Sequence, residues 1–302
     1  MTEGKLLISL DTEIAWGRVG HSDQSQLGAL YQKTKEVIRR LIELFDKYDI
    51  PVTWAVVGRL VDKRNANDQA IRGMMAEFYP GIEPNEYEGD FYSFPDLMDL
   101  LAGSTSKPEV TSHSYSHIVY GDADATLAET DLSEAGEVLK QHQLSPATFI
   151  FPRNSIDHLE AVKAAGFSHY RRKGQSWLDR IPGKLRQVSS LLDILLPIAP
   201  EVGKASLHQT GLIGVPGGLL FRKSNLGLRK IVPVSALKRK ALLGLKKAVR
   251  KREIFHLWFH PFNFAYDSEN HFKEFEKVLQ KADELRKSGE LEILTVNRVK
   301  IA

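Results

Sequence analysis

Short apolar runs and amphipathic stretches alternate along almost the whole chain. Lys5–Asp11 and Pro51–Gly58 are continuous apolar runs of the length and composition expected for buried strands. Between them, Leu27–Asp49 repeats its apolar residues at helical spacing. Strands that alternate with helices are typical of a parallel sheet or a β/α barrel. We therefore predict an α/β protein in which residues 1–302 form a single domain.

The pattern continues through the second half of the chain and becomes irregular in two places. An elaborated connection is expected over residues 62–103, with a short helix from Pro95, and residues 173–233 break into short segments with Gly and Pro. The other predicted helices are Asp124–Gln143, Ser155–Ala165, Val234–Arg250 and Glu269–Lys287. The other predicted strands are Ala147–Phe151, Phe167–Arg171, Ile254–His260 and Leu291–Val296.

The absence of cysteine limits how the chain could hold a metal. Without thiolates, any transition metal must be bound by His, Asp or Glu, and disulfides are excluded. The composition, 42% hydrophobic and 26% charged, is otherwise that of a soluble globular protein. The first apolar run is too short for a signal peptide, and no stretch approaches the roughly 20 apolar residues that span a bilayer. We therefore expect a cytoplasmic protein.

Two histidines four residues apart, His113 and His117, follow a short β-favouring run that begins at Glu109. Such a pair is weak evidence by itself, because residues four apart share a helix face for many structural reasons. A catalytic metal site would also need a carboxylate ligand and an acid or base nearby.

Polar residues of the required kinds gather where the predicted strands end. Asp11 and Glu13 follow the first strand, Arg153 and Asn154 follow the fourth, and His260 ends a late one. In β/α barrels the carboxyl ends of the strands form one face, on which active sites are built. Two histidines and one carboxylate would give a three-ligand metal site with an open position, as in catalytic zinc centres. The second carboxylate could then act as a base.

These segments resemble the motifs of the polysaccharide deacetylase (NodB-homology, carbohydrate esterase 4-like) superfamily, over about residues 5–264. Ser9–Glu13 is similar to the first motif, which usually reads T-F-D-D, and His113–His117 resembles the metal-binding H-[ST]-x-x-H motif. Phe151–Asn154 is similar to the third motif, and Leu257–Pro261 to the late strand that ends in the catalytic histidine. The resemblance implies a distorted (β/α)7 barrel, one divalent metal ion with Zn²⁺ expected, and hydrolytic removal of an acyl group from an N-acylated sugar.

The first motif departs from the family pattern, because Thr12 stands where the family has a second, metal-binding Asp. Some relatives space their acids as D-x-[DE], so Glu13 is the preferred metal ligand beside His113 and His117. Asp11 is then the preferred catalytic base.

The remaining predicted site residues follow the later strands. By resemblance, His260 is the group that protonates the departing amine, and Arg153 orients the base or contacts the substrate. Asn154 and Trp258 are predicted to bind the substrate, whereas His256 is interpreted as a hydrogen-bonded core histidine. For the family's fourth motif, the only candidate is Trp177 with Asp179.

Positive charge is concentrated late in the chain, although the formal net charge is only +3. Val202–Arg252 holds 13 Lys and Arg and no Asp or Glu. The plain interpretation is a solvated helix face. The functional one is that residues 222–252 attract a nucleotide-sugar, a lipid-linked glycan or the inner face of an anionic membrane. Nucleic acid is not expected, because no binding motif accompanies the charge.

The leading functional prediction is a metal-dependent carbohydrate N-deacetylase that acts on a cytoplasmic precursor of a surface polysaccharide. One alternative keeps the metal and changes the substrate to a small cyclic amide, as in allantoinase-like members of the superfamily. Another is a carbohydrate-binding relative without activity, which Thr12 and the altered third motif would permit.

Overall fold

The computed structural model describes residues 3–20, 28–64, 69–83, 88–174, 193–223 and 232–301. Trp177, Asp179 and residues 224–231 of the basic stretch lie outside these ranges. The strands are β1 (Gly4–Thr12), β2 (Thr53–Val56), β3 (Glu109–Ser112), β4 (Thr148–Phe149), β5 (His169–Arg171), β6 (Ser206–Leu207), β7 (Ile213–Val215), β8 (Leu219–Leu220), β9 (Ile254–Phe259) and β10 (Leu291–Leu294). The α-helices are α1 (Gly28–Lys47), α2 (Gln69–Phe78), α3 (Leu97–Ala102), α4 (Ala125–Gln141), α5 (Leu159–Ala164), α7 (Val234–Lys251) and α8 (Ser268–Lys287).

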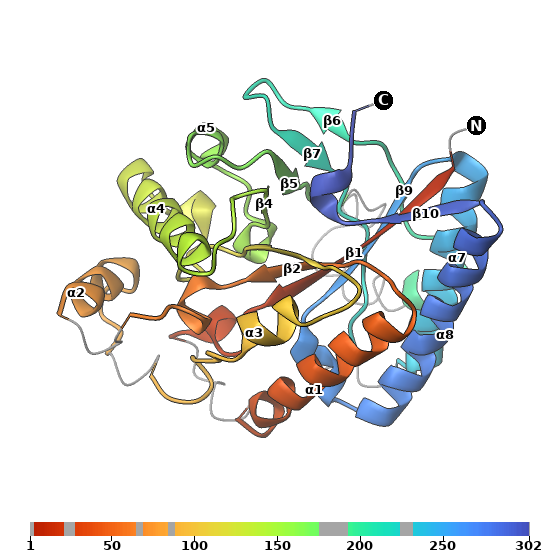
Figure 1. The fold of residues 1–302 in the computed structure, drawn as a ribbon, viewed down its shortest axis with the longest axis horizontal. Helices are drawn as coiled ribbons and strands as arrows, with labels where there is room; N and C mark the ends of the chain where they lie inside the picture. The colour runs from red at the N-terminus through yellow and green to blue at the C-terminus, as the bar shows by residue number, and fades with distance from the viewer. Residues whose placement is uncertain are drawn as a thin grey trace.

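The strands form one curved sheet in the order β6-β7-β5-β4-β3-β2-β1-β9-β8, with β10 beside β1. Only the β6–β7 pair is antiparallel among the described strands. Helices lie around the sheet, with α7 and α8 side by side along one flank and α4 and α5 at the other (Figure 1). Parallel order with helical crossovers is the arrangement that alternating apolar runs and amphipathic stretches predict.

β1 is the central strand, and its nine residues are almost all buried. Along one edge it pairs with β9, from Lys5 to Leu10. Its other edge is shared, because Gly4–Leu7 pair with β10 and Ser9–Thr12 pair with β2. The carboxyl end of β1 is therefore held between β2 and β9, whose own ends carry residues of the candidate site.

A three-residue segment, Pro216–Gly218, joins the two ends of the sheet. β7 pairs with β5 and β8 pairs with β9, so the short link between β7 and β8 curls the sheet into a distorted barrel. A Cβ atom on Gly217 would lie 2.3 Å from the carbonyl oxygen of Arg172, and one on Gly218 would lie 2.1 Å from that of His256. Both glycines are therefore required by close backbone approach. The predicted distorted (β/α)7 barrel is confirmed.

The predicted elements agree with the structure except in three places. The connection over residues 62–103 contains the predicted short helix as α3 and also α2, which was not predicted. The helix expected from Ser155 begins only at Leu159, because Pro152–Asn154 form a short 3-10 turn and His158 has a left-handed backbone. The irregular region of residues 173–233 supplies β6, β7 and β8 within its described part. None of the helices in the described ranges is both long and apolar enough to cross a bilayer.

Candidate active site

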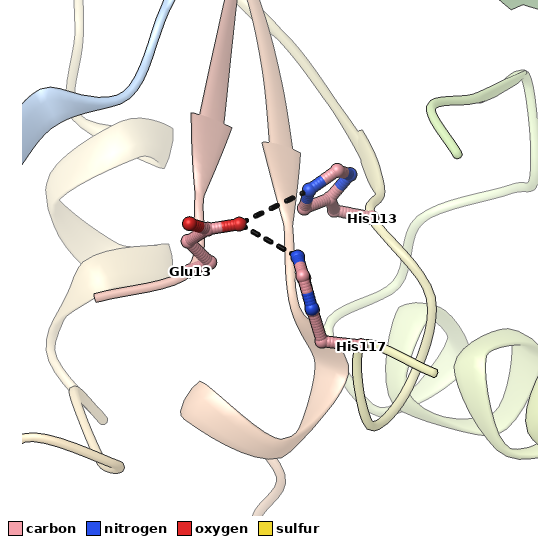
Figure 2. Close-up of side chains that lie close together, drawn as sticks. All are labelled: Glu13, His113 and His117. Carbon is pink, nitrogen blue, oxygen red and sulfur yellow. Dashed lines mark ion pairs between the residues drawn. The ribbon is translucent and has the colours of Figure 1, made fainter. Parts of the chain in front are cut away.

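Glu13, His113 and His117 meet at the carboxyl ends of β1 and β3 (Figure 2). The Nε2 atom of His117 lies 2.6 Å from Oε2 of Glu13, and the Nε2 atom of His113 lies 3.5 Å from the same oxygen. All three side chains are buried. The carboxylate that joins the two histidines is thus Glu13, the ligand preferred from the sequence.

The donor atoms of this cluster fit a divalent metal ion. Nδ1 of His113 lies 2.7 Å from the carbonyl oxygen of Ile150, which can only accept, so this nitrogen carries the proton and Nε2 keeps its lone pair. The Nε2 atoms of His113 and His117 are buried, and neither makes a well-formed hydrogen bond with the described residues. Two imidazole nitrogens and one carboxylate oxygen, all within 4.8 Å of one another, are a ligand set that Zn²⁺ and similar ions accept.

A buried aspartate on α4 shapes the loop that carries the two histidines. The carboxylate of Asp131 accepts hydrogen bonds from the backbone N–H groups of Tyr115 and Ser116, each at 3.0 Å, and from the Tyr120 hydroxyl at 2.8 Å. Ser114 and His117 have left-handed backbones, with φ of 70° and 66°. The histidine pair therefore lies on a tight loop rather than on a helix.

Glu13 lies where three histidines and a glycine converge. A Cβ atom on Gly17 would lie 2.3 Å from Oε1 of Glu13, so only glycine leaves room for the carboxylate. Nε2 of His260 lies 3.5 Å from the same Oε1 atom. Burial alone would raise the pKa of Glu13, but the charges of His260 and His117 outweigh it and hold this pKa well below its usual range.

Asp11 forms a separate, buried ion pair beside the cluster. Arg171, at the end of β5, donates from Nη1 and Nη2 to the two carboxylate oxygens of Asp11, both at 2.7 Å. The Arg171 side chain is only 1% exposed. Burial raises the pKa of Asp11, but the charges of Arg171 and then His113 lower it by more than burial raises it. The pKa therefore lies below its ordinary value, and the carboxyl group is ionised at neutral pH.

Arg171 is itself fixed by three further side chains. The Asn154 Oδ1 atom accepts from its Nη2 at 3.0 Å, Ser9 Oγ accepts from Nη1 at 3.2 Å, and the Trp258 ring lies 4.2 Å from the guanidinium carbon. His256 completes this chain of contacts, since its Nε2 atom lies 2.9 Å from Ser9 Oγ and its Nδ1 donates to the Pro216 carbonyl. Burial lowers the pKa of His256 to about 3, so its neutral ring accepts from the Ser9 hydroxyl.

The structure brings most of the predicted site residues into contact with one another, while the role assigned to Arg153 stays a prediction. Arg171 rather than Arg153 makes the bidentate contact with Asp11, and Arg153 is an exposed residue with a left-handed backbone. Asn154 and Trp258 both contact Arg171, while their binding of substrate stays a prediction. The interpretation of His256 as a hydrogen-bonded core histidine is confirmed.

Two residues of the site, Arg171 and Asp131, were not predicted, although the sequence contains a signal for each. Arg171 ends a predicted strand, the position that singled out Asp11 and His260. Asp131 lies on the apolar face of α4, three residues after Ala128 and four before Ala135. A charged residue on such a face is seldom buried without partners.

No family model and no curated protein matches this sequence. Solved structures match at low sequence identity. A Mycobacterium smegmatis protein assigned as a polysaccharide deacetylase is 11% identical with a TM-score of 0.64, and the match covers 98% of this chain and 88% of that one. The allantoinase PuuE is 12% identical with a TM-score of 0.62, covering 97% and 89%. A Pseudomonas aeruginosa PAO1 protein assigned as a polysaccharide deacetylase is 13% identical with a TM-score of 0.60, covering 97% and 89%. The chain therefore has the NodB-like fold of the polysaccharide deacetylase superfamily.

Proposed function

We propose that the protein is a metal-dependent hydrolase that removes an acyl group, in the first place N-acetyl, from a sugar. The observation that carries this proposal is the buried cluster of Glu13, His113 and His117 next to a second, ionised carboxylate, Asp11. A divalent ion bound by the cluster, with Zn²⁺ the expected one, would supply a Lewis acid for the acyl carbonyl and for a water molecule. The fold shared with assigned polysaccharide deacetylases supports a carbohydrate substrate.

Asp11 is held in the ionised state that a catalytic base requires, and His260 lies beside the same cluster. The Arg171 ion pair keeps Asp11 deprotonated, so its carboxylate can accept the proton of the attacking water. Burial lowers the pKa of His260, with Glu13 and then Asp11 partly opposing it, and its ring faces Glu13 from the end of β9. The ring is therefore mostly neutral at neutral pH, and in this assignment it takes up a proton before it gives one to the departing amine.

Replacement of one histidine tests the metal and the chemistry together. The His113→Ala variant should lose both the bound ion, measured by elemental analysis, and the release of acetate from N-acetylated sugars. His208→Ala is a matched control, because His208 lies in the β6–β7 turn, where its Nδ1 atom contacts Thr210. A folded His113→Ala protein that keeps its metal and full activity would contradict the proposal.

A second candidate function is the hydrolysis of a small cyclic amide. The TM-score of the match to the allantoinase differs by 0.02 from that of each of the two deacetylase matches, and the same cluster of ligands could serve either reaction. A panel of N-acetylated sugars, nucleotide-sugars and cyclic ureides separates the two. Turnover confined to the ureides would replace the deacetylase assignment.

A further inference from the structure

A pocket of about 350 Å³ lies beside the candidate metal site, between the end of β2 and α2. Its wall includes Trp16, which comes three residues after Glu13, and Arg59, which comes three residues after β2 ends. The other charged residues that line it are Asp62, Arg64, Arg72 and Glu88. The pocket thus combines three guanidinium groups with two carboxylates and one aromatic wall.

Arg59 is a largely buried cation whose one recorded ion pair among the described residues, with Asp62, is long. Its side chain is 11% exposed, and its Nε atom is buried without a hydrogen-bond partner among the described residues. In this ion pair, Oδ2 of Asp62 lies 3.9 Å from Nη1 of Arg59. A buried charge is costly unless it is paired and hydrogen-bonded, so the Arg59 guanidinium is suited to binding an anion.

Asp62 neutralises Arg59 only weakly, because both of its carboxylate oxygens accept shorter hydrogen bonds from other donors. Oδ2 of Asp62 accepts from Nη2 of Arg64 and from the Tyr115 hydroxyl, both at 2.8 Å. Oδ1 accepts from the backbone N–H and Nε of Arg64, each at 3.0 Å, and from Gln141 at 3.2 Å. The donors of Arg59 therefore remain available to a ligand in the pocket.

The pocket is joined directly to the loop that carries the metal-site histidines. The backbone N–H of Gly58 donates to the Ser114 carbonyl at 3.0 Å, and that of Arg59 donates to the Tyr115 carbonyl at 2.9 Å. Trp16 lies on the short turn that follows Glu13. One ligand could therefore reach both places, with its anionic part at Arg59 and its acyl group at the candidate metal site.

We propose that this pocket binds a phosphate group of the substrate, with Arg59 as its main contact. A planar guanidinium with unused donors matches phosphate oxygens well. The identity of the ligand as a phosphorylated N-acyl sugar rests on the proposed function, whereas phosphate binding itself does not. A nucleoside diphosphate and a polyprenyl diphosphate carrier both present this chemistry.

The binding experiment uses inorganic pyrophosphate and the metal-free His113→Ala protein, because a bound metal would also attract phosphate. Calorimetry should detect binding that weakens at least about tenfold when Arg59→Gln is added, since charged hydrogen bonds are lost. Arg59→Lys should retain part of the affinity. Arg298→Gln removes the same charge from an exposed position just after β10, which lies far from α2 in Figure 1, and should leave binding unchanged. Unchanged binding in a folded Arg59→Gln protein, or none in His113→Ala, would overturn the proposal.

The kinetic experiment separates this inference from the proposed function. With otherwise wild-type enzyme, Arg59→Gln should raise KM for UDP-N-acetylglucosamine or a polyprenyl-diphosphate-linked sugar in micelles, and should leave the neutral methyl glycoside unaffected. The form that shows the larger effect identifies the carrier. Equal KM changes for charged and neutral sugars would refute the phosphate site while the deacetylase assignment stands. Pyrophosphate binding that depends on Arg59, without any deacetylation, would support the phosphate site and contradict the deacetylase assignment.

Discussion

Asp11 and Glu13 lie two residues apart at the carboxyl end of β1, yet they have different partners. Glu13 faces His113, His117 and His260, whereas both oxygens of Asp11 are occupied by one guanidinium. The pKa of each carboxyl group is lowered in spite of burial, in one case by histidines and in the other by an arginine. One strand end thus supplies a metal-ligand candidate and a base candidate.

Exchange of Arg171 for lysine tests its role as the residue that orients Asp11. Lysine keeps the positive charge but cannot form the two parallel hydrogen bonds. We expect kcat to fall at least about tenfold, with a smaller change in KM, because misplaced catalytic groups chiefly raise the barrier. Steady-state kinetics on both Arg171→Lys and Arg153→Gln provide the comparison. A large kcat effect in Arg153→Gln alone would show that the exposed arginine has the role first assigned to it.

The sequence allowed a residue of this site to be predicted where a family-like motif stood at the end of a predicted strand. Asp11, Glu13, His113 and His260 each follow an apolar run, so the barrel rule places them on one face. Arg171 meets the same rule, but its partner lies 160 positions away, and nothing local distinguishes it from a surface arginine. Only the fold shows which arginine reaches the base.

At the scale of elements, Gly217 and Gly218 allow the segment between β7 and β8 to lie close against the neighbouring backbone. β7 and β8 are too short to be recognised by periodicity, and they are separated only by Pro216–Gly218. The long elements β1, α1, α7 and α8 were predictable because each repeats its pattern over many residues. The short ones depend on tertiary contacts that no local window contains.

Substitution of Gly218 by alanine should disturb β9 and the residues that it carries. The added methyl group would meet the backbone of His256, which cannot move without shifting the strand that ends near His260. We expect a loss of about 1–3 kcal/mol in the free energy of unfolding. Urea denaturation measures this change. Gly136→Ala on α4 is the control, because no atom outside its own stretch of helix lies within 4 Å of the added Cβ, and it should stabilise by up to about 1 kcal/mol. Equal stability of the two variants would contradict this account.

At the scale of the whole molecule, the basic stretch has fewer unpaired positive charges than its sequence suggests. Lys238 pairs with Glu274 at 2.5 Å, and Lys240 pairs with Asp193. The Lys247 ammonium lies 3.7 Å from Glu201. These contacts pair part of the positive charge of α7 with carboxylates of other segments. Attraction of anionic membrane to residues 222–252 stays a prediction, and the exposed Arg250 and Lys251 would have to supply part of it.

Acid should destabilise the protein in part through His271 on α8. Burial lowers its pKa from 6.5 to about 4, while the Tyr266 carbonyl hydrogen bond and Asp267 oppose this and Lys223 adds to it. The unfolded chain therefore binds more protons between these values, and stability falls as the pH drops below about 6.5. From pH 7 to pH 5 this single group should cost on the order of 2 kcal/mol. Urea midpoints of the wild type and His271→Gln should converge toward pH 5; parallel pH profiles would exclude the effect.

The shared edge of β1 also determines the order in which the molecule can assemble. β1 is synthesised long before two of its three partner strands, β9 and β10, which begin at Ile254 and Leu291. Until those segments leave the ribosome, β1 has open hydrogen-bonding edges, and such long-range pairing is slow to form. The end of β9 also brings His260 to Glu13. The candidate metal site is therefore completed only after β9 and β10 have been made.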